Sequence, residues 1–218
     1  MVLVRLLRKI KHRTKMRRNL TVCSGRIYNG DELLFALVAE RLHMQGRVDG
    51  VVGTLMSNLG LELALKQLNV GFERAKVGDR YVFEKLQANG WQLGCESSGH
   101  LLVLDRHSTG DGIVSALQVL RAVRNLGMPL ADILKPVAML PQVLKNARLP
   151  MGYDWANDVK VQGVCEAVKA ELGSNGRLLI RPSGTEPVLR VMVETADKGT
   201  ANRLVDSILA ALPKAPPQ

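Results

Sequence analysis

The 218-residue sequence has few cysteines, few aromatic residues and no long uninterrupted hydrophobic run. Its three cysteines, Cys23, Cys95 and Cys165, lie far apart and show no paired spacing. This spacing excludes a disulfide-stapled miniprotein, argues against a structural zinc site and favours a reducing, cytoplasmic location. No segment approaches the roughly 18 apolar residues of a membrane-spanning helix, so we expect no membrane partner. With 46% hydrophobic and 23% charged residues, the composition is typical of a globular protein.

Acidic residues are absent from the first 30 positions, which contain nine Lys or Arg residues. The remaining 188 positions hold 21 basic and 20 acidic residues, so nearly all of the net charge of +10 belongs to this N-terminal stretch. Nucleic-acid binding is therefore not expected except through the stretch itself. Arg5 and Arg8 interrupt any apolar signal-peptide core, and no aromatic side chain lies in residues 1–20. We expect residues 1–27 to form a basic arm that is disordered or non-native.

Residues 28–136 alternate apolar runs with amphipathic segments, which predicts an α/β domain of the βαβ type with a mixed sheet. Turn residues and helix caps bound each element. In the helix expected to start at Gly112, Ile113, Leu117, Leu120 and Val123 form an apolar stripe. The expected strands are 48–55, 72–77, 91–96 and 100–105, and the expected helices are 59–68, 78–89, 112–125 and a short one after Pro129.

Residues 137–212 show a different order of predicted secondary-structure elements, β-α-β-β-α. That order predicts a small α+β domain whose antiparallel sheet carries helices on one face. The expected strands are 141–149, 177–181 and 188–194, and the expected helices are 154–172 and 200–212. A Pro-rich tail occupies residues 213–218.

The segment Arg181-Pro-Ser-Gly-Thr-Glu-Pro187 has the composition of a phosphate-binding loop. A rigid loop with backbone N–H groups, hydroxyls and a guanidinium suits that ligand. Arg181, Ser183 and Thr185 supply side-chain donors, and Gly184 permits close backbone approach. Arg190 on the next strand is placed to contact the same anion. An ordinary hairpin turn is the alternative, because Ser, Gly and Pro are turn formers.

The segment Cys95-Glu-Ser-Ser-Gly-His100 places a carboxylate, hydroxyls and an imidazole between two apolar strands. Such groups suit the hydroxyls of a sugar, and an imidazole such as that of His100 is a common proton-transfer group. Lys76 lies at the end of a strand, where α/β sheets usually bind ligands. The alternatives are a polar turn with a hydrogen-bonded histidine and a solvated lysine. The single carboxylate of Thr109-Gly-Asp-Gly112 is weak support for a metal, so no metal-binding residue is assigned.

Five segments together, in this order and spacing, resemble the α-D-phosphohexomutase superfamily, and the similarity covers about residues 28–212. The first two segments favour its glucosamine branch over the phosphomannomutase and phosphoglucomutase branches. The segments are Gly53–Glu62 (GTLMSNLGLE), Lys76–Val82 (KVGDRYV), Glu96–His100 (ESSGH), Thr109–Val114 (TGDGIV) and Arg181–Pro187 (RPSGTEP).

The resemblance implies two adjacent domains, the third and fourth, of a four-domain enzyme that moves a phosphoryl group between the 6- and 1-positions of a hexose. It implies that Glu96 and Ser98 bind sugar hydroxyls and that His100 and Lys76 lie near the reacting centre. The residues implied to hold the phosphate that is not reacting are Arg181, Ser183, Gly184, Thr185 and Arg190.

Two elements of the resembled family have no counterpart in the sequence: the segment with the phosphorylated serine and the acidic loop that binds magnesium. We therefore expect the isolated chain to be inactive, and to interconvert glucosamine 6-phosphate and glucosamine 1-phosphate only with the missing N-terminal half supplied in trans. Mg²⁺ is the cofactor implied for the intact enzyme, and a hexosamine phosphate is the implied substrate. The alternatives are a non-catalytic sugar-phosphate-binding module and a mutase with another hexose preference.

Overall fold

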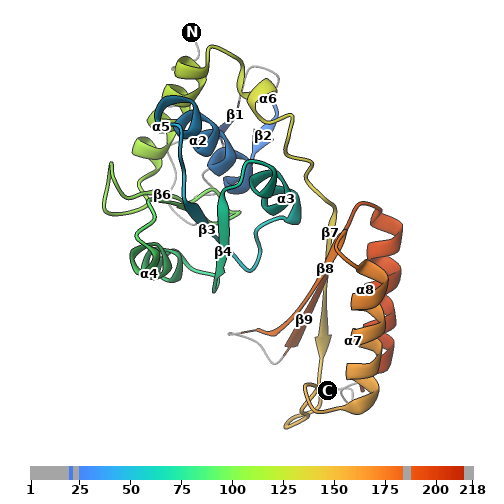
Figure 1. Ribbon diagram of the computed structural model, residues 1–218. Helices are drawn as coiled ribbons and strands as arrows, with labels where there is room; N and C mark the ends of the chain where they lie inside the picture. Colours follow the sequence, from blue (N-terminus) through green and yellow to red (C-terminus); the bar gives the residue numbers. More distant parts are fainter. Residues whose placement is uncertain (1–19, 22–24, 184–187, 214–218) are drawn as a thin grey trace. The chain divides into compact units, whose positions relative to one another are not determined.

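A computed structural model describes residues 20–21, 25–183 and 188–213 (Figure 1). The chain divides into two compact units, residues 1–138 (unit 1) and 139–218 (unit 2). No helix within the described ranges is long and apolar enough to cross a membrane. The finer domain limits expected from the sequence, after residues 27 and 212, stay predictions.

Unit 1 is built on a mixed four-stranded sheet with the order β4-β3-β5-β6. Strand β3 pairs in parallel with β4 and β5, whereas β5 pairs antiparallel with β6. All five residues of β3 are buried, as expected for a central parallel strand covered on both faces. This topology and its helices confirm the predicted α/β class. The elements are β1 (Leu20–Thr21), β2 (Ile27–Tyr28), α2 (Gly30–Gln45), β3 (Gly50–Thr54), α3 (Leu59–Gln67), β4 (Gly71–Ala75), α4 (Asp79–Asn89), β5 (Leu93–Cys95), β6 (Leu101–Val103), α5 (Gly112–Leu126) and α6 (Leu130–Ile133).

Helix α2 and the two short strands before it, β1 and β2, were not predicted by the sequence analysis. The start of α2 is fixed by a capping box, in which Asn29 accepts from the Glu32 N–H at 3.0 Å and Glu32 accepts from the Asn29 N–H at 3.1 Å. Its end is fixed by Gly46, which has a left-handed φ of 75°. The Asn-x-x-Glu spacing before an apolar run was the available signal. Because most of α2 is buried, it has no single apolar stripe to reveal it.

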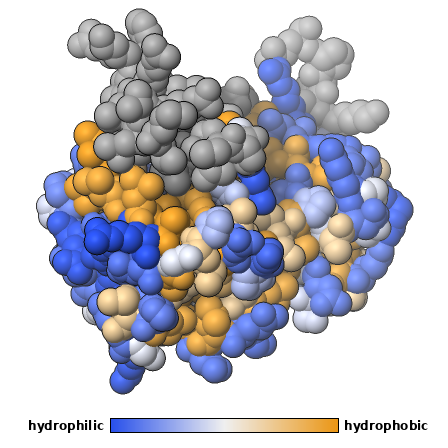
Figure 2. Space-filling view, turned by 90° about the horizontal axis from the view of Figure 1, so that it is seen from above, coloured by the Kyte–Doolittle hydropathy of each residue, from blue (hydrophilic) through white to orange (hydrophobic). Residues whose placement is uncertain are grey.

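Helix α5 forms where predicted, but the first half of its apolar stripe is exposed, and Leu120 and Val123 are only half-buried. Ile113 and Leu117 are 60% and 53% exposed, and the buried residues are Ser115, Val119 and Ala122. Small side chains on the buried face let α5 approach its neighbours closely, and the Ser115 hydroxyl donates to the Leu101 carbonyl oxygen at 3.3 Å. Apolar side chains also gather at the surface on the face seen from above in Figure 2.

Unit 2 is a three-stranded antiparallel sheet, in the order β7-β9-β8, with two helices. Its core joins one face of β9 to α7 and α8, which confirms the predicted α+β arrangement. Helix α7 begins at residue 159 rather than 154, because Asp158 caps it by accepting from the Lys160 and Val161 N–H groups. The elements are β7 (Gln142–Arg148), α7 (Val159–Leu172), β8 (Gly176–Pro182), β9 (Val188–Thr195) and α8 (Lys198–Ala211).

Candidate functional site

The candidate sugar site of unit 1 lies where strands β4 and β5 end. Lys76 directly follows β4, Glu96 directly follows β5, and α4 begins at Asp79. These two strands flank β3 and both run parallel to it, so their carboxyl ends share one edge of the sheet. This edge is the usual ligand position in α/β folds. The structure therefore places the 76–79 turn and the loop 96–100 at the same edge.

Glu96 ties these two segments together. Its Oε1 accepts a hydrogen bond from the Gly78 N–H at 3.0 Å, at the start of α4. The loop itself is closed by the Glu96 N–H donating to the His100 carbonyl oxygen at 2.8 Å and by the Gly99 N–H donating to the Glu96 carbonyl oxygen at 2.9 Å. Ser98 is exposed at the tip of this closed loop.

The His100 ring lies between Asp79 and Gly110. Its Nε2 lies 3.6 Å from Asp79 Oδ2, which is ion-pair distance but too long for a hydrogen bond. The same Nε2 is enclosed and has no hydrogen-bond partner within the described parts of the chain, although 25% of the side chain is exposed. A Cβ at Gly110 would lie 1.8 Å from Nε2, so a side chain at that position would displace the ring. Exposure of His100 is therefore confined to its other side-chain atoms.

Lys76 is exposed, and its Nζ lies 5.8 Å from the centroid of the Tyr81 ring. This distance allows a cation–π contact with the first turn of α4. The 76–79 turn is joined to the loop 96–100 by the Gly78 backbone N–H and the Asp79 carboxylate, whereas the Lys76 amine lies over Tyr81.

Asp31 is a functional candidate that the sequence analysis missed. It is 1% exposed, and its Oδ2 accepts from the Asn58 N–H at 2.9 Å and from the Ser97 hydroxyl at 3.2 Å. The Cys95 thiol lies 3.5 Å from Oδ1. Burial raises the pKa of Asp31, partly offset by these hydrogen bonds. The carboxyl thereby fixes the base of the loop 96–100, a role with no local sequence signal because its partners lie far away in the chain.

The candidate phosphate site of unit 2 lies on strands β8 and β9. Arg181 and Arg190 are directly opposite each other in the antiparallel register. Like charges in this position repel, so the pair needs an anion or another source of compensation. The Nε atoms of both arginines are enclosed and have no hydrogen-bond partner among the described residues. An enclosed donor without an acceptor is unfavourable, and an anion bound at this position would supply acceptors.

The turn between these strands starts at Ser183, whose N–H donates to the Val188 carbonyl oxygen at 2.9 Å. Ser183 therefore lies next to the arginine pair in the ladder. Gly184 and Thr185, the other two predicted members of this loop, lie outside the described residues.

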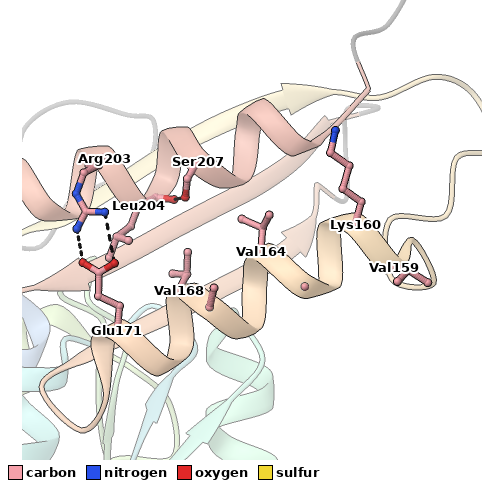
Figure 3. Close-up of a pocket in the computed structure, with 10 residues that line it drawn as sticks. Val159, Lys160, Val164, Val168, Glu171, Arg203, Leu204 and Ser207 are labelled. Carbon is pink, nitrogen blue, oxygen red and sulfur yellow. Dashed lines mark hydrogen bonds and ion pairs between the residues drawn. The ribbon is translucent and has the colours of Figure 1, made fainter.

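A groove of about 450 Å³ lies between helices α7 and α8 of unit 2 (Figure 3). Apolar side chains such as Val164 and Leu204 line it, and the Glu171–Arg203 ion pair lies at one end. None of the predicted site residues lines this groove, and its helices cover the opposite face of the sheet from Arg181 and Arg190. It is therefore not assigned to the site.

Comparison with known proteins identifies both units. Residues 29–139 match the family described as "Phosphoglucomutase/phosphomannomutase, alpha/beta/alpha domain III", and residues 144–211 match "Phosphoglucomutase/phosphomannomutase, C-terminal domain". The chain is 55% identical over 193 residues to a phosphoglucosamine mutase of Delftia acidovorans, covering 88% of this chain and 43% of that protein. It is 56% identical over 188 residues to a phosphoglucosamine mutase of Cupriavidus metallidurans, covering 86% of this chain and 42% of that protein.

Solved structures agree with this assignment at the level of the fold. Aspergillus fumigatus N-acetylphosphoglucosamine mutase, solved in complex with GlcNAc-6P and magnesium, has a TM-score of 0.68 and 18% identity. The match covers 88% of this chain and 49% of that one, so the chain spans less than half the length of these relatives. The two matched regions, in family order and over most of the sequence, show that the chain belongs to the phosphoglucomutase/phosphomannomutase family of phosphohexomutases.

Proposed function

We propose that this chain supplies the sugar-binding and phosphate-binding domains of a phosphoglucosamine mutase. The substrate pair is glucosamine 6-phosphate and glucosamine 1-phosphate. The observation that carries the proposal is the pair of enclosed Nε atoms of Arg181 and Arg190 on neighbouring strands, for which the described residues provide no hydrogen-bond acceptor. The identity of about 55% to named phosphoglucosamine mutases favours the glucosamine branch.

In this proposal, Arg181, Ser183 and Arg190, together with Gly184 and Thr185, hold the phosphate that does not react. Guanidinium groups suit this task because their planar donors match phosphate oxygens. This anchor lets the loop 96–100 meet the sugar, with Glu96 and Ser98 bonding its hydroxyls. Phosphoryl transfer depends mainly on such positioning and on charge stabilisation.

His100 and Lys76 complete the proposed site near the reacting end of the sugar. The His100 side chain is 25% exposed, and in this proposal its imidazole exchanges a proton with a substrate hydroxyl. The Lys76 amine is exposed and carries a positive charge that attracts a phosphoryl group. A cytoplasmic location stays a prediction from the cysteine content.

The magnesium implied for the family does not fit the described part of this chain. Across residues 20–21, 25–183 and 188–213, no group of three or more His, Cys, Asp or Glu side chains could hold a metal ion. No step of the proposal is therefore assigned to a metal bound by these residues.

Two experiments test the proposal. In the first, inorganic phosphate and glucosamine 6-phosphate are titrated into the 218-residue chain, and the Ser183 amide is followed by NMR. A single anchor gives weak binding, on the order of millimolar, which added salt weakens further. Arg181→Ala should abolish it, whereas Arg5→Ala in the basic arm should not change it. Equal chemical shift changes of the Ser183 amide in the wild type and in Arg181→Ala would show that the segment is an ordinary hairpin turn and not a phosphate site.

The second experiment adds a phosphoglucosamine mutase N-terminal half in trans and measures turnover. We expect turnover to be restored. The Glu96→Ala variant should give lower turnover than the wild type, because losing a charged hydrogen bond costs about 1.5–3 kcal/mol. Phosphate binding without any turnover would favour the non-catalytic binding module. Turnover with a mannose or glucose phosphate, and none with the glucosamine phosphate, would favour another branch of the family.

A further inference from the structure

The sheet of unit 2 has two different faces. Along β7, Val143 and Ala147 pack on the core, and Lys145 bonds to Asp206 of α8 at 2.7 Å. Because side chains alternate along a strand, Asn146 and Arg148 project from the opposite face. The same alternation applies to β8 and β9, where Leu178, Ile180, Leu189, Val191 and Val193 face the helices. Arg181 and Arg190 therefore share the helix-free face with Asn146 and Arg148.

One end of this helix-free face is electrically compensated. Arg177 and Glu194 are directly opposite in the register, and the Arg177 Nε and Nη2 lie 3.1 Å and 3.0 Å from Glu194 Oε2. The Glu194 side chain is fully buried and that of Arg177 is 16% exposed. The charge of Arg177 is thus neutralised by a carboxylate of the same sheet, on the neighbouring strand.

The other end of the face carries positive charge from all three strands. Arg190 on β9 is directly opposite Arg181 on one side and Asn146 on the other. Arg148 is opposite Val188, which makes it the diagonal neighbour of Arg190. Diagonal positions lie about 7–8 Å apart, within reach of long side chains. None of these three arginines has a carboxylate partner among the described residues.

We propose that the anion site of unit 2 extends onto β7, with Asn146 and Arg148 as further binding residues for the phosphate group of a sugar phosphate. This inference rests on the proposed phosphate site and adds two residues that the motif does not contain. Asn146 supplies a neutral donor beside Arg190, and Arg148 supplies a third guanidinium at the end of the sheet where Ser183 lies. Three cations suit a phosphomonoester that carries two negative charges.

The test is an NMR titration of inorganic phosphate into the 218-residue chain at low salt, with five variants: Arg181→Ala from the first experiment above and four new ones. Arg148→Ala should raise the dissociation constant for phosphate about fivefold or more, and Asn146→Ala should raise it about twofold to tenfold. Arg148→Lys should restore only part of the loss, because an ammonium lacks the planar fork of donors. Lys145→Ala is the matched control, since it removes a full charge next to Asn146 on the opposite face.

The outcomes separate the two proposals. Wild-type affinity in Asn146→Ala and Arg148→Ala, together with lost binding in Arg181→Ala, would overturn the extension and leave the phosphate site intact. An equal loss in Lys145→Ala and Arg148→Ala would overturn it too, because it would show attraction to net charge alone. Wild-type affinity in Arg181→Ala would remove the phosphate site, and the extension with it. Amide spectra of β7 without phosphate confirm that each variant is folded.

Discussion

Replacing Arg181 by Gln should make the chain more stable without phosphate and less stable with it. Arg181 and Arg190 are directly opposite on β8 and β9, where side chains start about 5 Å apart. Two unit charges about 5 Å apart repel by about 3 kcal/mol at an effective dielectric constant of about 20, and by about 0.8 kcal/mol in water. These figures are upper bounds, because the guanidinium groups are at the ends of flexible side chains that can spread apart. Both side chains are half-buried, so we expect Arg181→Gln to raise the free energy of unfolding of unit 2 by about 1 kcal/mol at low salt.

With phosphate bound, the wild type should become more stable than Arg181→Gln. A ligand at ten times its dissociation constant stabilises the folded state by about 1.4 kcal/mol, and only the wild type should receive that gain. Urea unfolding at low salt, with and without phosphate, measures both effects. The NMR signals of Val191 and Val193 report on unit 2 alone, because both residues belong to its core. If phosphate stabilises Arg181→Gln as much as the wild type, or if the two chains are equally stable without it, the reasoning about the arginine pair is refuted.

Three further changes test single contacts. Gly110→Ala should destabilise unit 1 by about 1–3 kcal/mol and shift the ring signals of His100, since the added Cβ would lie 1.8 Å from Nε2; unchanged ring signals would contradict this close approach of Gly110 to the ring. The pKa of Asp31 is raised by burial, so its contribution to stability is full below its ordinary pKa of 3.8 and is lost as pH rises through the folded value. Unfolding of Asp31→Asn at several pH values should lack this decline. A hydrogen bond to Asp158 raises the pKa of Tyr153 to about 12, and ultraviolet titration should show Asp158→Asn returning it toward 10.

Most elements could be predicted because their signals are local. Asn58 and Asp111 cap α3 and α5 with their own side chains, and Gly90 ends α4 in a left-handed conformation. Each of these signals depends on residues within one turn of the helix terminus. The order of the elements in unit 2 was likewise enough to predict its antiparallel sheet and helices.

Two helices show where local signals fail. Helix α2 is buried over most of its surface, so it lacks the one-sided apolar pattern by which amphipathic helices are found. Helix α5 has that pattern, but it buries Val119 and Ala122 and leaves Ile113 and Leu117 exposed. Which face of a helix is covered depends on the neighbours it meets, and the stripe alone does not specify them.

The sequence by itself determined the segments that carry the chemistry, because a motif such as Arg181–Pro187 is a property of consecutive residues. Only the tertiary structure decided which distant residues join them. The strand register set Arg190 opposite Arg181 and Asn146 opposite Arg190, and the packing of α2 buried Asp31 beneath the loop 96–100. These contacts join residues that are far apart in the chain, and they form only when folding brings their strands and helices together.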